Sequence, residues 1–422
     1  MQYLPRIYDT VLKRKLRASD AILIEGAKWC GKTTTAEQIA GSRLYMQKPD
    51  AREQNIRLAQ ISPSMLLEGE TPRLIDEWQL APELWDAVRF ECDHRGKFGQ
   101  FILIGSTVPP ERGAIKHTGT GHIGRIRMRP MSLVESGDST GSVSLRSLLE
   151  GAELPMVAGA ADIGRIAFLT ARGGWPRAIG QDDDVALQQA YNYVDAIAET
   201  EVSEVDKTQR SPERARFIMR SYARFTASQG KVSQMVADMS QSDVVASDKT
   251  VRTYLDVMKN LFVIEELSAW NPNLRSKAAI RTTNTRHYTD PSIAVAALGT
   301  DPDGLIADLR TFGLLFEGLC IRDLRCYMDE LDGFVSHYRD SSGLECDAVV
   351  HLRDGTYGLV EVKLGGDDLI EEGASSLKSL RDAIDTDKMG SPAFCMVLVG
   401  VGEYSYLRED GIFVVPICAL GA

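Results

Sequence analysis

The sequence predicts a multidomain α/β protein, and three observations support that class. A chain of 422 residues is too long for one ordinary domain. Short apolar segments alternate with helical stretches over about the first 135 residues, which predicts a parallel sheet with right-handed crossovers. A run of helices then fills the middle of the chain, and a second pattern of strands and helices begins at about residue 305.

The expected elements follow one another along the chain. The strands expected in the first pattern are residues 21–24, 44–46, 74–75 and 101–104, with helices at 32–40 and 81–95. Residues 136–147 are rich in Ser and Gly and read as a loop, and 160–200 read as helices broken at 173–176. The last pattern has helices at 305–327 and 371–385, and strands near 334–338, 345–351, 357–362, 394–399 and 412–415.

Composition excludes several classes of protein. The net charge of −11 argues against a chain that coats DNA along its whole length, yet residues 207–286 carry 14 Lys and Arg against 7 Asp and Glu. The seven cysteines form no Cys-x-x-Cys pair, which favours reduced thiols and a cytoplasmic location. No apolar run approaches the ~18 residues that cross a bilayer, so we expect no membrane partner.

A glycine-rich turn follows the first apolar strand. Gly26, Gly31, Lys32 and Thr33 match the pattern G-x-x-x-x-G-K-[ST], and a predicted helix follows them. Backbone N–H groups of such a turn surround phosphates, the lysine reaches the β- and γ-phosphates, and the Thr hydroxyl ligates Mg²⁺. The sequence therefore predicts a P-loop for ATP and Mg²⁺. Its expected nucleotide-binding residues are Gly26, Ala27, Lys28, Trp29, Cys30, Gly31, Lys32, Thr33 and Thr34.

Polar residues also follow the next strands of this sheet. Asp76 is expected to hold Mg²⁺ and Glu77 to orient or deprotonate the attacking water, although two solvated acids at a strand end are the competing interpretation. Ser106 is a candidate sensor of the γ-phosphate. Arg125 is a candidate arginine finger, in cis or from another subunit of a homo-oligomer, and Arg177 a candidate arginine of a helical lid. A salt-bridging surface arginine is the competing interpretation for both.

Carboxylates and a lysine recur near the C-terminus. Glu361 and Lys363 share one strand face, Asp347 is expected on the adjoining strand, and Glu317 lies on the preceding helix. Three carboxylates for a metal ion, with Glu361 and Lys363 as catalytic groups, suit a Mg²⁺-dependent phosphodiesterase and have the layout of the PD-(D/E)xK nuclease core. The alternatives are exposed charges on an edge strand, or a nuclease-like fold that only binds.

The middle of the chain suggests a contact with double-stranded DNA. Three helices within 211–260, followed by a short hairpin at 262–267, are the order of a winged helix. Lys249, Arg252 and Lys259 on the third helix are the expected DNA-binding residues. A helix that merely packs between domains is the alternative.

Several stretches resemble a known family. The first half is similar to a prokaryotic AAA-family P-loop ATPase, in GAKWCGKTTTA (26–36), LIDEWQLAPELWDAVR (74–89), FILIGST (101–107), GRIRMRPMSLVE (124–135) and GGWPRAIG (173–180). The second half resembles the domain of unknown function that usually follows it, in TVRTYLDVMKNLFVIEEL (250–267), RHYTDPSIA (286–294), GLLFEGLCIRDL (313–324), YRDSSGLECDAVV (338–350) and YGLVEVKLG (357–365).

The resemblance implies an AAA-like ATPase, then a winged helix, then a nuclease-like α/β domain. With the helices at 160–200 interpreted as a lid, the expected domains are an AAA-like ATPase core (1–155), a helical lid (156–205), a winged-helix region (206–300) and a restriction-endonuclease-like α/β domain of PD-(D/E)xK type (301–422). The resemblance supplies no substrate. The residues that it supports at matched positions are Lys32, Thr33, Asp76, Glu77 and Arg125, with Glu317, Asp347, Glu361 and Lys363 as a retained nuclease-like set.

Three functions remain open at this point. The first is an ATPase coupled to DNA binding or cleavage. The second is an ATP-dependent signalling switch or scaffold whose nuclease-like domain is inactive. The third is a toxin-like effector whose nuclease is licensed by ATP.

Overall fold

The computed structural model describes residues 3–105, 121–159, 161–205, 208–240, 246–272 and 282–422. The chain divides into two compact units. Unit 1 comprises Met1–Pro130, Thr200–Arg210 and Asp256–Phe262, and unit 2 comprises Met131–Glu199, Ser211–Leu255 and Val263–Ala422. Two short stretches from late in the sequence therefore belong to the N-terminal unit.

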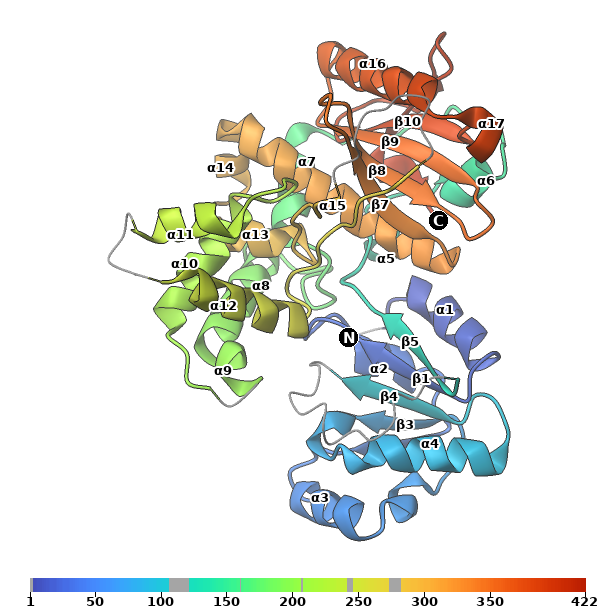
Figure 1. The fold of residues 1–422 in the computed structure, drawn as a ribbon, viewed down its shortest axis with the longest axis vertical. Coiled ribbons are helices and arrows are strands. Elements are labelled where there is room, and N and C mark those ends of the chain that lie inside the picture. Colours follow the sequence, from blue (N-terminus) through green and yellow to red (C-terminus); the bar gives the residue numbers. More distant parts are fainter. Residues whose placement is uncertain (1–2, 106–120, 160, 206–207, 241–245, 273–281) are drawn as a thin grey trace. The chain divides into compact units, whose positions relative to one another are not determined.

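Unit 1 contains a five-stranded sheet in the order β2-β3-β4-β1-β5, with every neighbouring pair parallel (Figure 1). Its strands are β1 (Ala21–Glu25), β2 (Ser42–Tyr45), β3 (Arg73–Asp76), β4 (Phe101–Gly105) and β5 (Ile123–Arg127). The predicted parallel sheet is confirmed, and β5 is an addition that the sequence pattern missed. Gly124 and Arg125 separate the apolar residues Ile123 and Ile126 of this strand, so it contains no continuous apolar run.

Three helices of unit 1 connect its strands, namely α2 (Lys32–Glu37), α3 (Arg52–Ile61) and α4 (Glu83–Arg95). Helix α1 (Ile7–Leu16) precedes β1, and the short α9 (Val202–Glu204) comes from a later stretch of the sequence. The helix expected at 32–40 ends early, at Glu37. A core of apolar side chains from β1, β3, β4 and α4 includes the tilted pair Trp78 and Trp85, whose ring centroids lie 4.9 Å apart.

Unit 2 begins with short elements and a helical layer. These are α5 (Leu133–Ser136), β6 (Val143–Ser144), α6 (Leu145–Leu149), α7 (Ile163–Arg172), α8 (Asp183–Ala196), α13 (Pro291–Leu298) and α14 (Pro302–Ala307). The loop expected at 136–147 thus holds part of three elements. Helix α13 packs against α7 and α8. A Cβ on Gly174 would lie 2.0 Å from the Met131 carbonyl oxygen, which explains a glycine at the break between α7 and α8.

Three further helices follow in the expected order. They are α10 (Pro212–Ala223), α11 (Val232–Ser240) and α12 (Asp248–Asn260). The expected hairpin at 262–267 differs, because Ile264 and Leu267 form antiparallel bridges with Tyr288 and Thr285. The segment that pairs with residues 264–267 is therefore 285–288, and no tight turn joins the two.

The C-terminal part of unit 2 is a six-stranded mixed sheet in the order β11-β12-β10-β9-β8-β7. Its strands are β7 (Phe334–Arg339), β8 (Glu345–His351), β9 (Tyr357–Lys363), β10 (Phe394–Val399), β11 (Tyr406–Leu407) and β12 (Phe413–Pro416). A further short strand, β13 (Leu420–Gly421), pairs with β6. Strands β7 to β9 are an antiparallel meander, and β9 runs parallel to β10 after α16 (Asp367–Ala383).

Two helices pack against this sheet. Helix α15 (Leu309–Glu330) contacts β7, β8 and β9, while α16 contacts β8, β9 and β10 (Figure 1). The helix expected at 305–327 is broken at Asp308, whose carboxylate accepts hydrogen bonds from the Thr311 backbone and hydroxyl and so begins a new helix. The short helix α17 (Thr386–Met389) precedes β10.

Candidate functional site

The turn after β1 has the backbone shape that the glycine pattern requires. Gly26 has φ 155°, and a Cβ there would lie 2.0 Å from the Met128 carbonyl oxygen. Gly31 has φ 100° and begins α2. Trp29, inside the turn, is also left-handed with φ 68°. The backbone therefore follows a tight arc from Gly26 to the N-terminus of α2, where N–H groups and the helix dipole favour an anion.

The lysine that closes this arc is buried. Lys32 Nζ donates hydrogen bonds to the carbonyl oxygens of Gly26 and Ala27, each at 2.8 Å. Its ammonium is therefore positioned directly across the arc, where the phosphates of a nucleotide are expected to lie.

Two side chains from outside the glycine pattern also hold the turn. The buried Arg6 guanidinium donates to the Cys30 carbonyl oxygen at 2.8 Å and to the Arg129 carbonyl oxygen at 2.9 Å. Lys28 Nζ lies 2.7 and 2.6 Å from the two carboxylate oxygens of Glu201. Neither contact follows from the motif, because each partner is distant in sequence.

The structure brings together the two residues expected to bind Mg²⁺. Thr33 Oγ1, at the start of α2, donates to Asp76 Oδ1, at the end of β3, at 3.2 Å. Burial, with the nearby Glu77 carboxylate, raises the pKa of Asp76 to about 6, although Thr33 and Lys32 oppose that shift. A hydroxyl and a carboxylate are hard oxygen donors that fit Mg²⁺. These two side chains are therefore suited to share the ion.

The remaining candidates of unit 1 have different surroundings. Glu77 adopts the left-handed conformation with φ 56°, and its carboxylate accepts a hydrogen bond from Gln79 Nε2. Arg125 on β5 is 56% exposed and lies 3.0 Å from Glu25 Oε1. Ser106 lies outside the described residues. Arg177 is an exposed residue of unit 2.

Comparison with known families agrees with this geometry. The family model described as AAA domain matches residues 18–136, which contain the parallel sheet, the P-loop and the Thr33–Asp76 contact. Residues 18–136 form an AAA-like P-loop ATPase domain. Two models described as domains of unknown function, DUF8612 and DUF4143, match residues 164–304 and 312–420.

Whole-chain comparisons give relatives without a described activity. Uncharacterized proteins of Mycobacterium bovis and Mycobacterium tuberculosis are each 22% identical over 409 residues, which is 96% of this chain and 82% of theirs. Among solved structures, a Walker-type ATPase of Pyrococcus abyssi is similar, with a TM-score of 0.46 and 15% identity. That similarity covers 70% of this chain and 96% of the other.

In unit 2, the predicted C-terminal carboxylates lie close enough to perturb one another. Burial, with Asp347 and Glu361, raises the pKa of Glu317 well above its ordinary value. The Asp347 carboxylate accepts the Val362 N–H at 2.8 Å just beyond the paired part of β8 and β9, and burial raises the pKa of Asp347. Burial and the Asp347 charge likewise raise the pKa of Glu361.

Lys363 has two acidic neighbours at this site. Its Nζ lies 3.7 Å from Glu361 Oε2 and 3.0 Å from Glu372 Oε1, on α16. Burial opposes the charge of Lys363, but the Glu361, Glu372 and Asp347 carboxylates together outweigh it and raise the lysine pKa. The structure thus gathers the acids and the lysine that the sequence grouped. Within the described parts of the chain, no group of three or more His, Cys, Asp or Glu side chains has the arrangement of a metal site.

The expected DNA-binding residues lie on the solvent side of α12. Lys249, Arg252 and Lys259 are exposed, whereas the opposite side of the helix buries Val251, Tyr254, Leu255 and Met258. Arg252 is paired with Asp248 at 2.6 Å, and Asp256 is exposed on the same helix. The exposed face therefore carries both signs of charge.

Across the described residues, no helix is both long and apolar enough to span a membrane.

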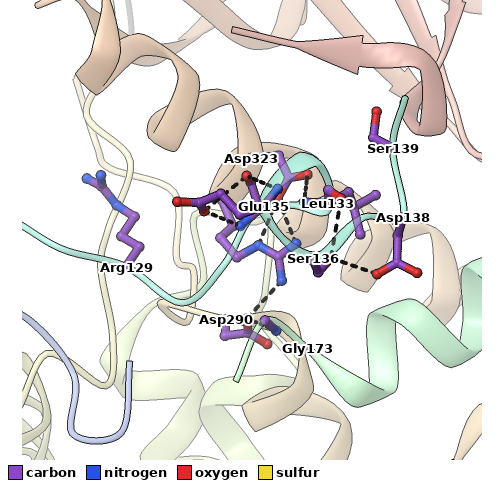
Figure 2. Close-up of polar contacts among 12 residues, drawn as sticks. Arg129, Leu133, Glu135, Ser136, Asp138, Ser139, Gly173, Asp290 and Asp323 are labelled. Carbon is purple, nitrogen blue, oxygen red and sulfur yellow. Dashed lines mark hydrogen bonds and ion pairs between the residues drawn. The ribbon is translucent and has the colours of Figure 1, made fainter. Parts of the chain in front are cut away.

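Sequence reasoning missed a buried ionic network in unit 2 (Figure 2). Arg322 lies 2.9 Å from an oxygen of Asp290 and 2.6 Å from one of Asp323. Asp323 Oδ2 accepts the Leu133 N–H at 3.0 Å, and Asp290 Oδ2 accepts the Gly174 N–H at 2.9 Å. The network joins four separate sequence segments. The only sign of this network in the sequence is that charged residues interrupt the apolar pattern of α15. The sequence alone does not show which residues these charges pair with.

Proposed function

We propose that the chain is a Mg²⁺-dependent ATPase that hydrolyses ATP at the P-loop of unit 1. The observation that carries this proposal is the Thr33–Asp76 contact beside the lysine-closed turn, within a domain of AAA type. Mg²⁺ held by these residues would neutralise charge on the β- and γ-phosphates. Lys32 would exchange its backbone carbonyl partners for phosphate oxygens.

Glu77 is the proposed group that orients or deprotonates water. It follows Asp76 directly, and its carboxylate already accepts a hydrogen bond from Gln79. Exchange of that donor for a water molecule would leave a carboxylate oxygen to receive the proton of the attacking water.

Two substitutions test these roles. Lys32→Ala should lose tight nucleotide binding, whereas Lys48→Ala, which removes an exposed lysine paired with Asp50, should not. Glu77→Gln should bind ATP yet hydrolyse it at least ~100-fold more slowly. Calorimetric titration with ATP and steady-state phosphate release measure the two effects. Unchanged affinity in Lys32→Ala, or normal turnover in Glu77→Gln, would remove the residue from its role.

Arg125 is proposed to contribute to turnover, within its own subunit or in a neighbour. Its exposure and its place on the edge strand β5 suit a group that a second copy of the chain could reach. If Arg125 acts in a neighbouring subunit, turnover per subunit should rise with protein concentration. The same rise should be smaller in the Arg125→Ala variant. A flat dependence in a verified monomer would exclude that role.

A second candidate function is metal-dependent cleavage of double-stranded DNA by the C-terminal domain. The convergence of Glu317, Asp347, Glu361 and Lys363 favours it, because clustered carboxylates with raised pKa values are donors that a divalent cation would stabilise. Lys249, Arg252 and Lys259 on α12 are the proposed contacts with the DNA backbone.

The test is cleavage of plasmid and linear DNA with Mg²⁺ or Mn²⁺, with and without ATP. Activity should be lost in Asp347→Ala and in Lys363→Ala, but not in Lys378→Ala, which removes an exposed lysine of α16. Cleavage that requires ATP would favour a coupled or ATP-licensed nuclease. ATP hydrolysis without any cleavage would favour the alternative, a nucleotide-dependent switch or scaffold.

A further inference from the structure

Lys28, inside the P-loop, forms an ion pair with an acid from a distant part of the chain. Its ammonium contacts both carboxylate oxygens of Glu201, at 2.7 and 2.6 Å. The Lys28 side chain is 37% exposed and that of Glu201 is 14% exposed. The pair is therefore partly shielded from water, and its attraction is stronger than that of a fully solvated pair.

Lys28 is also one of the residues expected to bind the nucleotide. It is inside the arc between Gly26 and Gly31, whose backbone N–H groups are expected to surround the phosphates. A lysine ammonium is a compact charge on a flexible stem, so it can turn from one anion to another without moving the backbone. The phosphates of ATP carry several negative charges, whereas Glu201 carries one.

Glu201 lies on an unusual part of the chain. It is the last residue of a π-helical turn, Ile197–Glu201, and such turns often occur at functional sites. Inside this turn, between Glu199 and Thr200, the chain passes from unit 2 to unit 1. Arg210 then holds the segment, because its guanidinium donates to the Val202 carbonyl oxygen at 2.7 Å and its N–H to Ser203 Oγ at 3.1 Å.

From these contacts we propose that Glu201 sets the nucleotide affinity of the P-loop by competing with the phosphates for Lys28. Without nucleotide, Glu201 holds Lys28 and anchors residues 200–205. With nucleotide, Lys28 turns to the phosphates and Glu201 loses its partner, which loosens this segment. The inference rests on the proposed nucleotide site and names a regulatory residue outside residues 18–136.

The test is a double-mutant cycle on the full chain, with Mg²⁺ and a non-hydrolysable ATP analogue as the titrant. Glu201→Gln should bind the analogue about fivefold more tightly than the wild type, because the competing charge is gone. Lys28→Met should bind it about fivefold more weakly. In the Lys28→Met background, Glu201→Gln should give no further change. The matched control is Glu204→Gln, which removes an exposed acid of α9 and should leave affinity unchanged.

Several outcomes would overturn the proposal. An unchanged affinity in Glu201→Gln would do so, and so would a gain that persists in Lys28→Met, because repulsion through space would then explain it. Hydrogen exchange gives a second readout that a merely structural pair would not move. Amides of residues 200–205 should exchange faster when the analogue binds, and should already be fast in Lys28→Met.

Failure of this proposal and failure of the ATP site can be told apart. If the wild type and Lys32→Ala both fail to bind the analogue, the nucleotide site itself is wrong. If the wild type binds, Lys32→Ala does not and the cycle shows no coupling, only the role of Glu201 is wrong.

Discussion

Replacement of Arg322 by Met should strongly destabilise unit 2. The Arg322 side chain is 1% exposed, and the side chains of its partners Asp290 and Asp323 are fully buried. Removing the cation leaves two buried carboxylates without a counter-charge. Loss of one partner from a buried ionic network typically costs about 3–5 kcal/mol, so we expect a loss of that size.

The pH dependence gives a further test of the same reasoning. Burial opposes the charge of Arg322, but the Asp323 and Asp290 carboxylates outweigh it and hold the Arg322 pKa above its ordinary value. Burial also raises the pKa of Asp323 although Arg322 opposes that shift, so loss of the guanidinium should raise the Asp323 pKa further. The stability difference between Arg322→Met and the wild type should therefore shrink as the pH falls and Asp323 becomes protonated.

Arg216→Met is the matched control for this variant. Arg216 also bridges two carboxylates, Asp195 at 2.9 Å and Glu199 at 2.7 Å, but its side chain is 40% exposed. Exposed pairs contribute little, so the control should lose no more than about 1 kcal/mol. Because two compact units need not unfold together, hydrogen exchange of unit 2 amides should accompany urea denaturation. A loss in Arg322→Met no larger than that in Arg216→Met would refute the reasoning.

Three further predictions concern single residues. Gly26→Ala should lose nucleotide binding and destabilise unit 1 by about 2–4 kcal/mol, since its Cβ would meet the Met128 carbonyl oxygen at 2.0 Å; calorimetric titration and urea denaturation measure this. Burial lowers the pKa of His287 to about 3, so the unfolded chain takes up a proton first as the pH falls, and stability should drop by about 2 kcal/mol from about pH 7 to pH 5. A His287→Gln variant should show a shallower pH slope in the same urea measurements. Ser132→Ala should cost about 1–2 kcal/mol in thermal or urea unfolding, because it removes the buried hydroxyl that accepts the Glu135 N–H and donates to the Glu135 carboxylate at the start of α5.

The sequence predicts the nucleotide site best where the motif is local. The arc from Gly26 to Thr33 is contiguous, so glycine geometry, the following helix and the lysine position all follow from one stretch. The prediction that Asp76 belongs to this site needs one further inference, which is that the carboxyl ends of parallel strands lie at the same edge of a sheet. The Thr33–Asp76 hydrogen bond agrees with that inference.

Other parts depend on partners that lie far apart in sequence. Arg6 reaches the Cys30 carbonyl oxygen, and Glu201 reaches Lys28, across separations that no periodicity encodes. The antiparallel partner of Ile264 is Tyr288 rather than a neighbouring turn residue, for the same reason. Long-range pairing is fixed by packing of the whole unit, and a single sequence gives it no local signal.

Unit 1 is built from three separate stretches of the sequence. Its parallel sheet comes from the first 130 residues, yet it also contains Thr200–Arg210 and Asp256–Phe262, which lie between segments of unit 2. Side-chain contacts hold both stretches to the N-terminal part of unit 1, through Glu201 to Lys28 and through Phe262 to Arg127, whose guanidinium lies 5.2 Å from the Phe262 ring centroid. Glu201 lies two residues after Glu199, at which the segment of unit 2 that contains α8 ends. For that reason the state of the Lys28–Glu201 pair is the first place to look for coupling between nucleotide and unit 2.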